Sequence, residues 1–179
     1  MKITFLLSLF FSPVILLAQE KMLTKTGKIT FEASVPSFEE ITAINHMGSC
    51  LLNSKTGEIT YLVLIKGFQF KLALMEEHFN EDYMESNSYP KATFKGIIKE
   101  LSSSDIETTP KEFKLIGKLT IHGKTRDIAT NAIVRKVDGG IEIISDFNIN
   151  SDDYAIEIPT IISKKINKKI AIKTEFLVK

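Results

Sequence analysis

The stretch Gly117-Lys118-Leu119-Thr120-Ile121-His122-Gly123-Lys124-Thr125-Arg126 decides the fold, because a strand ends there in a polar turn that opens the next strand. Apolar residues alternate along the strand and share one face: Phe113, Leu115, Leu119 and Ile121. The opposite face carries lysines, Thr120 and His122, and Gly123 follows where the backbone must bend. The stretch therefore predicts a half-buried antiparallel strand that leads into a hairpin.

The same period of two recurs along most of the chain. Residues 28–35, 141–150 and 170–178 alternate apolar with polar positions, which is typical of strands with one face on a core. Shorter runs of strand character complete the set: 48–53, 58–66, 68–72, 92–101 and 127–137. About eight antiparallel strands have to protect their edges, and closure into a barrel does so most completely. An eight-stranded barrel is just wide enough to be filled by side chains or to hold one small ligand.

One segment breaks the strand pattern. Residues 74–85 are rich in Glu and Met, have no Gly or Pro, and place Met75, Phe79 and Tyr83 at helical spacing. Tyr89-Pro90 then ends the segment. We therefore predict an all-β protein, an antiparallel eight-stranded β-barrel with one short helix, which forms a single domain over residues 19–179.

Residues 1–18 show the charged, apolar and polar regions of a secretory signal peptide in their usual order. Lys2 is followed by an apolar run, and Ala18 precedes polar residues. The apolar run is short for a membrane span, although an uncleaved anchor is the alternative. We therefore expect a periplasmic or secreted protein, cleaved near Ala18, without stable membrane insertion.

Charge and cysteine content argue against a nucleic-acid-binding protein and against a disulfide-stabilised one. Lysines and acidic residues are nearly balanced and interleaved, so nucleic acid is not an expected partner. The basic cluster at residues 164–169 is interpreted as a solvated loop before the last strand. Cys50 is the only cysteine, which rules out an internal disulfide. Burial of Cys50 beside Leu51 and Leu52 is favoured over pairing between chains. A homodimer is kept as an alternative to the monomer.

Catalytic and metal-binding patterns are missing from the sequence. The three histidines, His46, His78 and His122, are not in a metal-ligand spacing, and no nucleophile or phosphate-binding motif is found. Convergence of the histidines on a metal is the less favoured alternative to ordinary polar or loop positions. We expect His122 to be exposed or bonded to a turn. The sequence thus predicts a protein that is not an enzyme and has no cofactor or metal.

Four segments together resemble a known family. Glu76-Glu77-His78-Phe79 is followed by Tyr89-Pro90-Lys91-Ala92-Thr93-Phe94-Lys95-Gly96, then by the 117–126 stretch, then by Ile149-Asn150-Ser151-Asp152-Asp153-Tyr154. This order resembles the YceI-like family, lipocalin-like bacterial proteins that bind polyisoprenoid lipids. The resemblance runs from about Gly27 to the C-terminus. It implies a lipocalin-like barrel that binds an apolar lipid, a polyprenyl chain or an isoprenoid quinone.

If the barrel is hollow, apolar side chains on the inward faces would line the ligand cavity. We expect polar groups at its mouth near His78, Tyr83 and Tyr89. The candidate lining residues are Phe68, Phe70, His78, Phe79, Tyr83, Tyr89, Phe94, Leu119, Ile121, Phe147, Ile149 and Phe176. The main hypothesis is a non-catalytic lipid carrier, with an accessory role in electron transfer if the lipid is a quinone. The alternative is a barrel filled by Phe side chains that acts through its surface.

Overall fold

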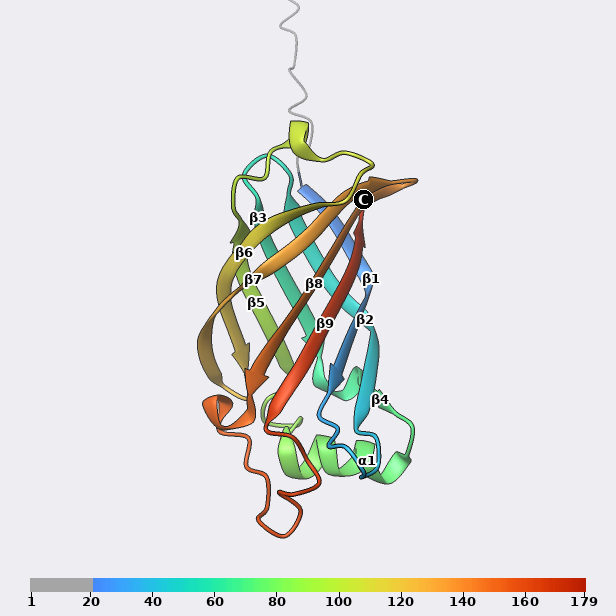
Figure 1. Ribbon diagram of the computed structural model, residues 1–179, viewed down its shortest axis with the longest axis vertical. Coiled ribbons are helices and arrows are strands. Elements are labelled where there is room, and N and C mark those ends of the chain that lie inside the picture. The colour runs from blue at the N-terminus through green and yellow to red at the C-terminus, as the bar shows by residue number, and fades with distance from the viewer. Residues whose placement is uncertain (1–20) are drawn as a thin grey trace, which may run out of the picture.

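The computed structural model describes residues 21–179, so the predicted signal peptide lies outside the described residues. Eight strands form a closed antiparallel barrel in the order β1-β9-β8-β7-β6-β5-β3-β2, and pairing of β1 with β2 closes it (Figure 1). A two-residue strand, β4, pairs with the end of β2. The strands are β1 (Lys21–Glu32), β2 (Thr42–Asn53), β3 (Glu58–Leu64), β4 (Gln69–Phe70), β5 (Lys91–Ile98), β6 (Lys111–Ile121), β7 (Lys124–Val137), β8 (Gly140–Asn150) and β9 (Lys169–Val178). The predicted fold class is confirmed.

The predicted helix is confirmed as well. It consists of α1 (Ala73–His78) and the π-helical turn η2 (Phe79–Tyr83) that continues it. Single 3₁₀ turns are formed by η1 (Ile65–Gly67), η3 (Ser103–Asp105) and η4 (Ser151–Tyr154). None of the helices within residues 21–179 is both long enough and apolar enough to span a membrane.

Strands β1 and β2 are longer than predicted, because the alternation of inward and outward residues shifts by one residue within each of them. On β2, His46 and Met47 are both exposed, so the inward positions shift by one residue between Asn45 and Gly48. The β1–β2 pairing has register shifts on either side of Gly27. Such bulges interrupt the period of two without ending the strand. The predicted strand at 68–72 was wrong in extent, since only Gln69–Phe70 pairs with a neighbour.

Three stacked aromatic rings fill the barrel in the half that contains the C-terminus. The ring of Tyr61 lies between those of Phe176 and Phe94, at centroid distances of 4.5 and 5.2 Å. Glycines face two of these rings: an added Cβ on Gly27 would lie 2.0 Å from the Phe176 ring. On the paired residues Gly96 and Gly117 it would lie 2.7 and 2.6 Å from Phe94 Cζ. The glycines thus make room for a solid aromatic layer.

Substitution of one of these glycines should therefore destabilise the barrel. A Cβ on Gly117 would also lie 2.5 Å from the Lys95 carbonyl oxygen, which is backbone and cannot rotate away. We expect Gly117→Val to lower the free energy of unfolding by about 3 kcal/mol, at the upper end for overpacked cores. Urea unfolding measures the loss. Lys118→Val, on the exposed side of the same strand, is the control; an equal loss in both would contradict this packing.

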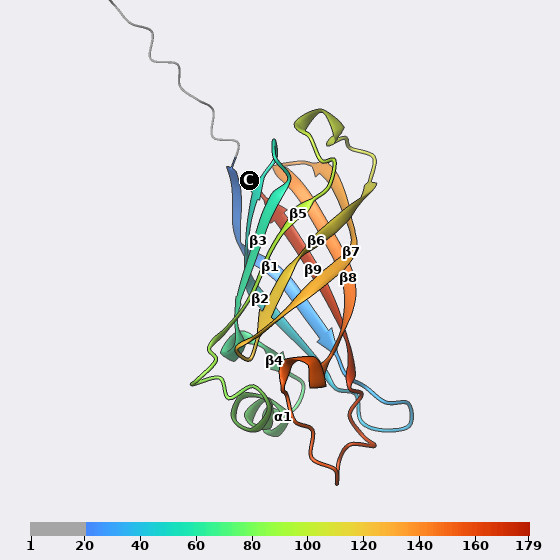
Figure 2. The ribbon, with the colours of Figure 1, turned by 90° about the vertical axis from the view of Figure 1, so that its left-hand side faces the viewer.

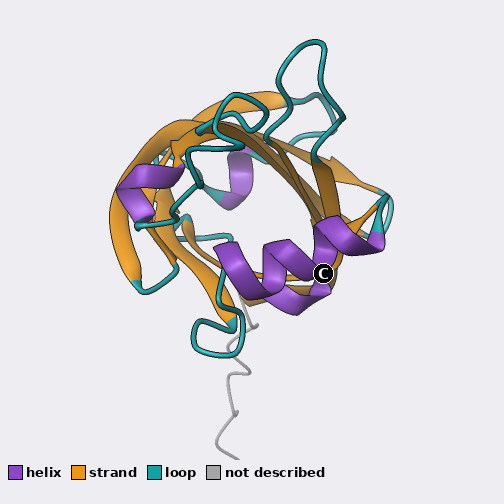
Figure 3. Ribbon diagram, turned by 90° about the horizontal axis from the view of Figure 1, so that it is seen from below, coloured by secondary structure: helices purple, strands orange, loops and turns teal. Residues whose placement is uncertain are grey.

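The opposite end of the barrel carries the irregular segments. Helix α1, loop 33–41 and loop 155–168 all lie there, away from the C-terminus (Figure 2). Seen along the barrel from this end, the helix and the loops surround the opening (Figure 3). Any route from this end into the barrel interior therefore passes between them.

Candidate functional site

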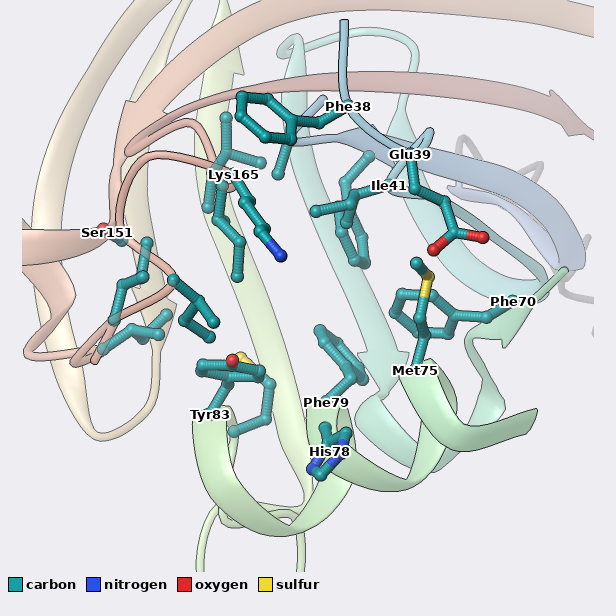
Figure 4. A pocket seen from close by; sticks show the side chains of 18 residues that line it. Phe38, Glu39, Ile41, Phe70, Met75, His78, Phe79, Tyr83, Ser151 and Lys165 are labelled. Carbon is teal, nitrogen blue, oxygen red and sulfur yellow. The ribbon is translucent and has the colours of Figure 1, made fainter. Parts of the chain in front are cut away.

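An apolar cavity occupies the half of the barrel that the aromatic layer leaves free. Its outer chamber, about 320 Å³ in volume, lies between helix α1, loop 33–41 and loop 155–168 (Figure 4). Its lining is mostly Phe, Ile and Met, and the side chains with polar atoms are Glu39, His78, Tyr83, Ser151 and Lys165. Apolar walls with a few polar groups are typical of small-molecule sites, whose volumes range from about 300 to 1,000 Å³.

A smaller inner chamber continues from the outer one toward the aromatic layer. Its volume is about 110 Å³, and the rings of Tyr61 and Phe94 form part of its wall. Both chambers share a set of lining residues, which we call the neck: Phe31, Phe79, Met84, Ile156 and Ile170. The two chambers therefore meet at the neck, and together they outline an elongated apolar space that suits a long, narrow ligand better than a compact one.

Helix α1 and η2 supply one side of the neck through a cluster of aromatic rings. Phe79 stacks on Phe31 with a centroid distance of 5.2 Å and contacts Phe70 at 5.0 Å and Phe68 at 5.8 Å. The helix therefore packs onto one side of the open end through aromatic rings and not through polar side chains. These contacts explain why a short helix, too short to be stable alone, keeps its position.

Most of the predicted cavity residues come together around the two chambers. Phe70, His78 and Tyr83 lie on the outer chamber, and Phe79 lies on both. The inner chamber is lined by Phe68, Phe94, Leu119, Ile121, Phe147 and Ile149. Two candidates lie elsewhere. Phe176 belongs to the aromatic layer, and Tyr89 packs against the ring of His122 at 4.3 Å. Whether the lining residues bind a ligand stays a prediction.

The sequence analysis missed the contribution of two loops. Loop 155–168 provides Ile158, Ile162 and Ile166, and loop 33–41 provides Phe38 and Ile41. Five isoleucines between residues 156 and 166, in a segment that Pro159 excludes from a long helix, were the available signal. Residues 164–169 are mostly exposed, as interpreted for a solvated loop, and Lys165 in addition lines the outer chamber, into which its side chain points (Figure 4).

The polar groups at the opening are held by local pairs. His78 Nδ1 lies 2.7 Å from Asp82 Oδ2, one helical turn away, and both side chains are about half exposed. Burial, with a smaller effect of the Asp82 charge, raises the pKa of the Tyr83 phenol, so the phenol stays neutral. On the other side of the opening, Lys168 Nζ pairs with Asp152 at 2.9 Å. The paired charges lie outside the apolar interior.

His122 joins two of the walls around the opening. Its Nε2 lies 2.8 Å from Glu85 Oε2, just after the helix, and its Nδ1 lies 3.2 Å from the carbonyl oxygen of Tyr154, just before loop 155–168. Both partners are hydrogen-bond acceptors, a carboxylate and a backbone carbonyl, and the ring lies between them. The side chain is 10% exposed. Of the two expectations for His122, the structure shows bonding to a turn and not exposure.

Removal of this imidazole should loosen the open end. We expect His122→Ala to lower the free energy of unfolding by about 1–3 kcal/mol, because the Tyr154 carbonyl loses its donor and Tyr89 loses its ring contact. Chemical denaturation measures the effect. His46→Ala, at an exposed position of β2, is the matched control. Equal stabilities of the two variants would show that His122 does not tie the walls together.

The cysteine and the histidines of residues 21–179 lie apart from one another. Cys50 is buried, as predicted, and burial raises the pKa of its thiol, which keeps it protonated. The histidines lie apart, on β2, on α1 and in the β6–β7 turn. Among residues 21–179, no group of three His, Cys, Asp or Glu side chains is placed to hold a metal ion. The site can therefore offer apolar surface and a few hydrogen bonds.

A closed eight-stranded antiparallel barrel with an apolar cavity at one end has the lipocalin-like architecture. Residues 20–177 match the model of the YceI-like domain, and the chain therefore belongs to the YceI-like family. No curated protein matches the sequence.

Solved structures share the fold at low sequence identity. A polyisoprenoid-binding domain from Saccharophagus degradans, implicated in plant cell wall breakdown, aligns with a TM-score of 0.78 and 15% identity over 90% of this chain and 98% of that chain. BcnA of Burkholderia cenocepacia aligns with a TM-score of 0.71 and 16% identity over 86% and 96%. A YCEI protein of Campylobacter jejuni gives 0.51 and 18% over 87% and 86%.

Proposed function

We propose that this protein is an exported, non-catalytic carrier that holds a polyisoprenoid or isoprenoid-quinone lipid in its barrel. The observation that carries the proposal is the elongated apolar cavity, filled at one end by the Phe94–Tyr61–Phe176 layer and open at the other. Membership of the YceI-like family and the polyisoprenoid-binding domain among the similar structures support the lipid class. The signal-peptide pattern of residues 1–18 supports export.

The physical chemistry of the cavity favours such a ligand. Each CH₂-sized group that moves from water into the apolar chambers contributes roughly 0.8 kcal/mol. An isoprenoid tail supplies many such groups in a narrow chain, whose shape matches two chambers joined by a neck. The polar atoms of the outer chamber, such as those of Tyr83 and Lys165, can orient a head group that remains near the opening. Only the excess over the cost of ordering the chain contributes to affinity.

Displacement of an apolar fluorescent probe tests this proposal. Purified protein, stripped of lipid by organic extraction and refolded, is loaded with diphenylhexatriene and titrated with a polyprenyl alcohol dissolved in detergent micelles. We expect saturable displacement at one lipid per protein, and weaker displacement by a compact sterol because it cannot pass the neck. Absence of probe uptake by the folded barrel would contradict the proposal and favour a protein that acts through its surface.

A further inference from the structure

The two ends of the barrel differ in the side chains that they expose. At the open end, the tips of two neighbouring loops expose large apolar side chains: Ile161 is 90% exposed and Phe38 is 48% exposed. At the other end, the connections 54–57, 99–110 and 138–139 have no large apolar side chain among the exposed ones. The exposed leucines near that end, such as Leu51, lie on strands. Exposed apolar side chains that gather at one end, unlike ones scattered singly, mark a candidate contact with an apolar surface.

The two loops are neighbours at their bases. The backbone N–H of Asn167 donates to the Ala33 carbonyl oxygen at 2.9 Å, so the loops are joined at their base. Lys164 and Lys165 lie within four residues of Ile161, and no ion-pair partner of either lysine is found in residues 21–179. We call Phe38, Ile161 and Lys164 the mouth patch, since the Lys165 side chain points into the outer chamber instead. Apolar side chains beside an unpaired, exposed lysine match a lipid interface with anionic head groups.

We propose that the mouth patch docks the open end of the barrel reversibly onto a lipid bilayer that contains anionic lipid. The inference rests on the proposed lipid-carrier function and adds where the ligand enters and leaves. Docking by these loop tips would place the outer chamber directly against the lipid, so the ligand's tail need not cross water. A protein partner is the less favoured occupant, because the patch is a set of protruding loop tips and not a groove.

The acidic side chains at this end set the orientation. Helix α1 and η2 expose Glu77, Glu81 and Asp82. An anionic bilayer repels these carboxylates, so we expect the barrel to tilt toward loop 155–168. Leu74, which is 61% exposed at the start of α1, lies outside the mouth patch. Glu39 and Glu40, next to Phe38, reduce the attraction of the patch, which makes docking weak and sensitive to salt. Weak docking suits a carrier that has to leave the membrane again.

Ile161 and Lys164 are suitable positions for the test. Neither side chain lines the cavity, so a substitution there leaves the ligand site unchanged. Flotation with vesicles of phosphatidylcholine, with or without phosphatidylglycerol, measures docking of the purified protein. We expect binding to the mixed vesicles, roughly tenfold weaker for Ile161→Ser because one isoleucine no longer enters the interface. Lys164→Gln should weaken binding to the mixed vesicles only. Ile133→Ser, which removes an exposed isoleucine from the barrel wall, should bind like the wild type.

Loading from detergent micelles, measured in parallel, separates this inference from the proposed function. Ile161→Ser should load normally from micelles and slowly from vesicles. If wild type and Ile161→Ser load from micelles but neither floats with the vesicles, docking is contradicted and the carrier function stands. If Ile133→Ser loses as much flotation as Ile161→Ser, or if Ile161→Ser instead abolishes self-association, the mouth patch has another occupant and the inference is wrong.

Discussion

Ile170→Trp is expected to lower the affinity for a polyisoprenoid lipid by roughly 100-fold while the barrel stays folded. Ile170 lines both chambers, and the larger indole would close the neck between them. A lipid chain excluded from the inner chamber forfeits several buried CH₂-sized groups at roughly 0.8 kcal/mol each, and about 1.4 kcal/mol corresponds to a tenfold change in affinity. Displacement of the diphenylhexatriene probe by the polyprenyl alcohol measures the change.

The adjacent residue provides the matched control for this substitution. Ala171 is exposed on the outside of the same strand, so Ala171→Trp adds the same ring without entering the cavity. We expect Ala171→Trp to retain wild-type affinity. If both variants bind lipid as the wild type does, the lipid does not pass the neck, and the elongated cavity is not its site.

Leu119→Arg is expected to lower the free energy of unfolding by about 3–5 kcal/mol. Leu119 is 6% exposed, pairs with Phe94 of β5 and lines the inner chamber, where a guanidinium would have no acidic partner. An uncompensated buried charge costs about 3–5 kcal/mol, against a total of about 5–15 kcal/mol for a typical domain. Circular dichroism during urea unfolding measures the loss.

The neighbouring position separates this effect from a general intolerance of arginine on β6. Thr120 is on the outer face of the same strand, where its hydroxyl contacts that of Thr125 at 2.8 Å. Thr120→Arg should cost less than about 1 kcal/mol, since exposed positions tolerate charge. A stable Leu119→Arg variant that still binds lipid would mean that the inner and outer faces of β6 are the reverse of those described here.

The alternation of apolar residues was sufficient to predict the barrel. On β6, β8 and β9 the inward positions follow the period of two without a break, and each is buried or half-buried. On β2 the pattern fails at His46 and Met47, because a bulge exposes two successive residues. Asn45 adds to the difficulty. It is polar yet buried, because its amide donates to the Leu64 carbonyl oxygen and accepts from the Met47 N–H.

The cavity could be predicted only in part, because hollowness depends on how rings from distant strands meet. Phe176 has the same strand pattern as Phe147, yet its ring stacks on Tyr61 and lines neither chamber, whereas Phe147 lines the inner chamber. The hollow interior and the interior filled by aromatic rings, which the sequence analysis treated as alternatives, thus each describe one half of the barrel. The loops were missed for another reason: residues such as Ile158 lie in an irregular segment, where periodicity gives no information on direction.

Native mass spectrometry of the protein purified from the cells that produce it, followed by organic extraction, tests the central claim most directly. The account predicts a complex heavier than the chain by one discrete apolar lipid, released on extraction and identified as a polyisoprenoid or an isoprenoid quinone. A protein that has only the mass of its own chain, and that stays so after incubation with polyprenyl lipids, would contradict it.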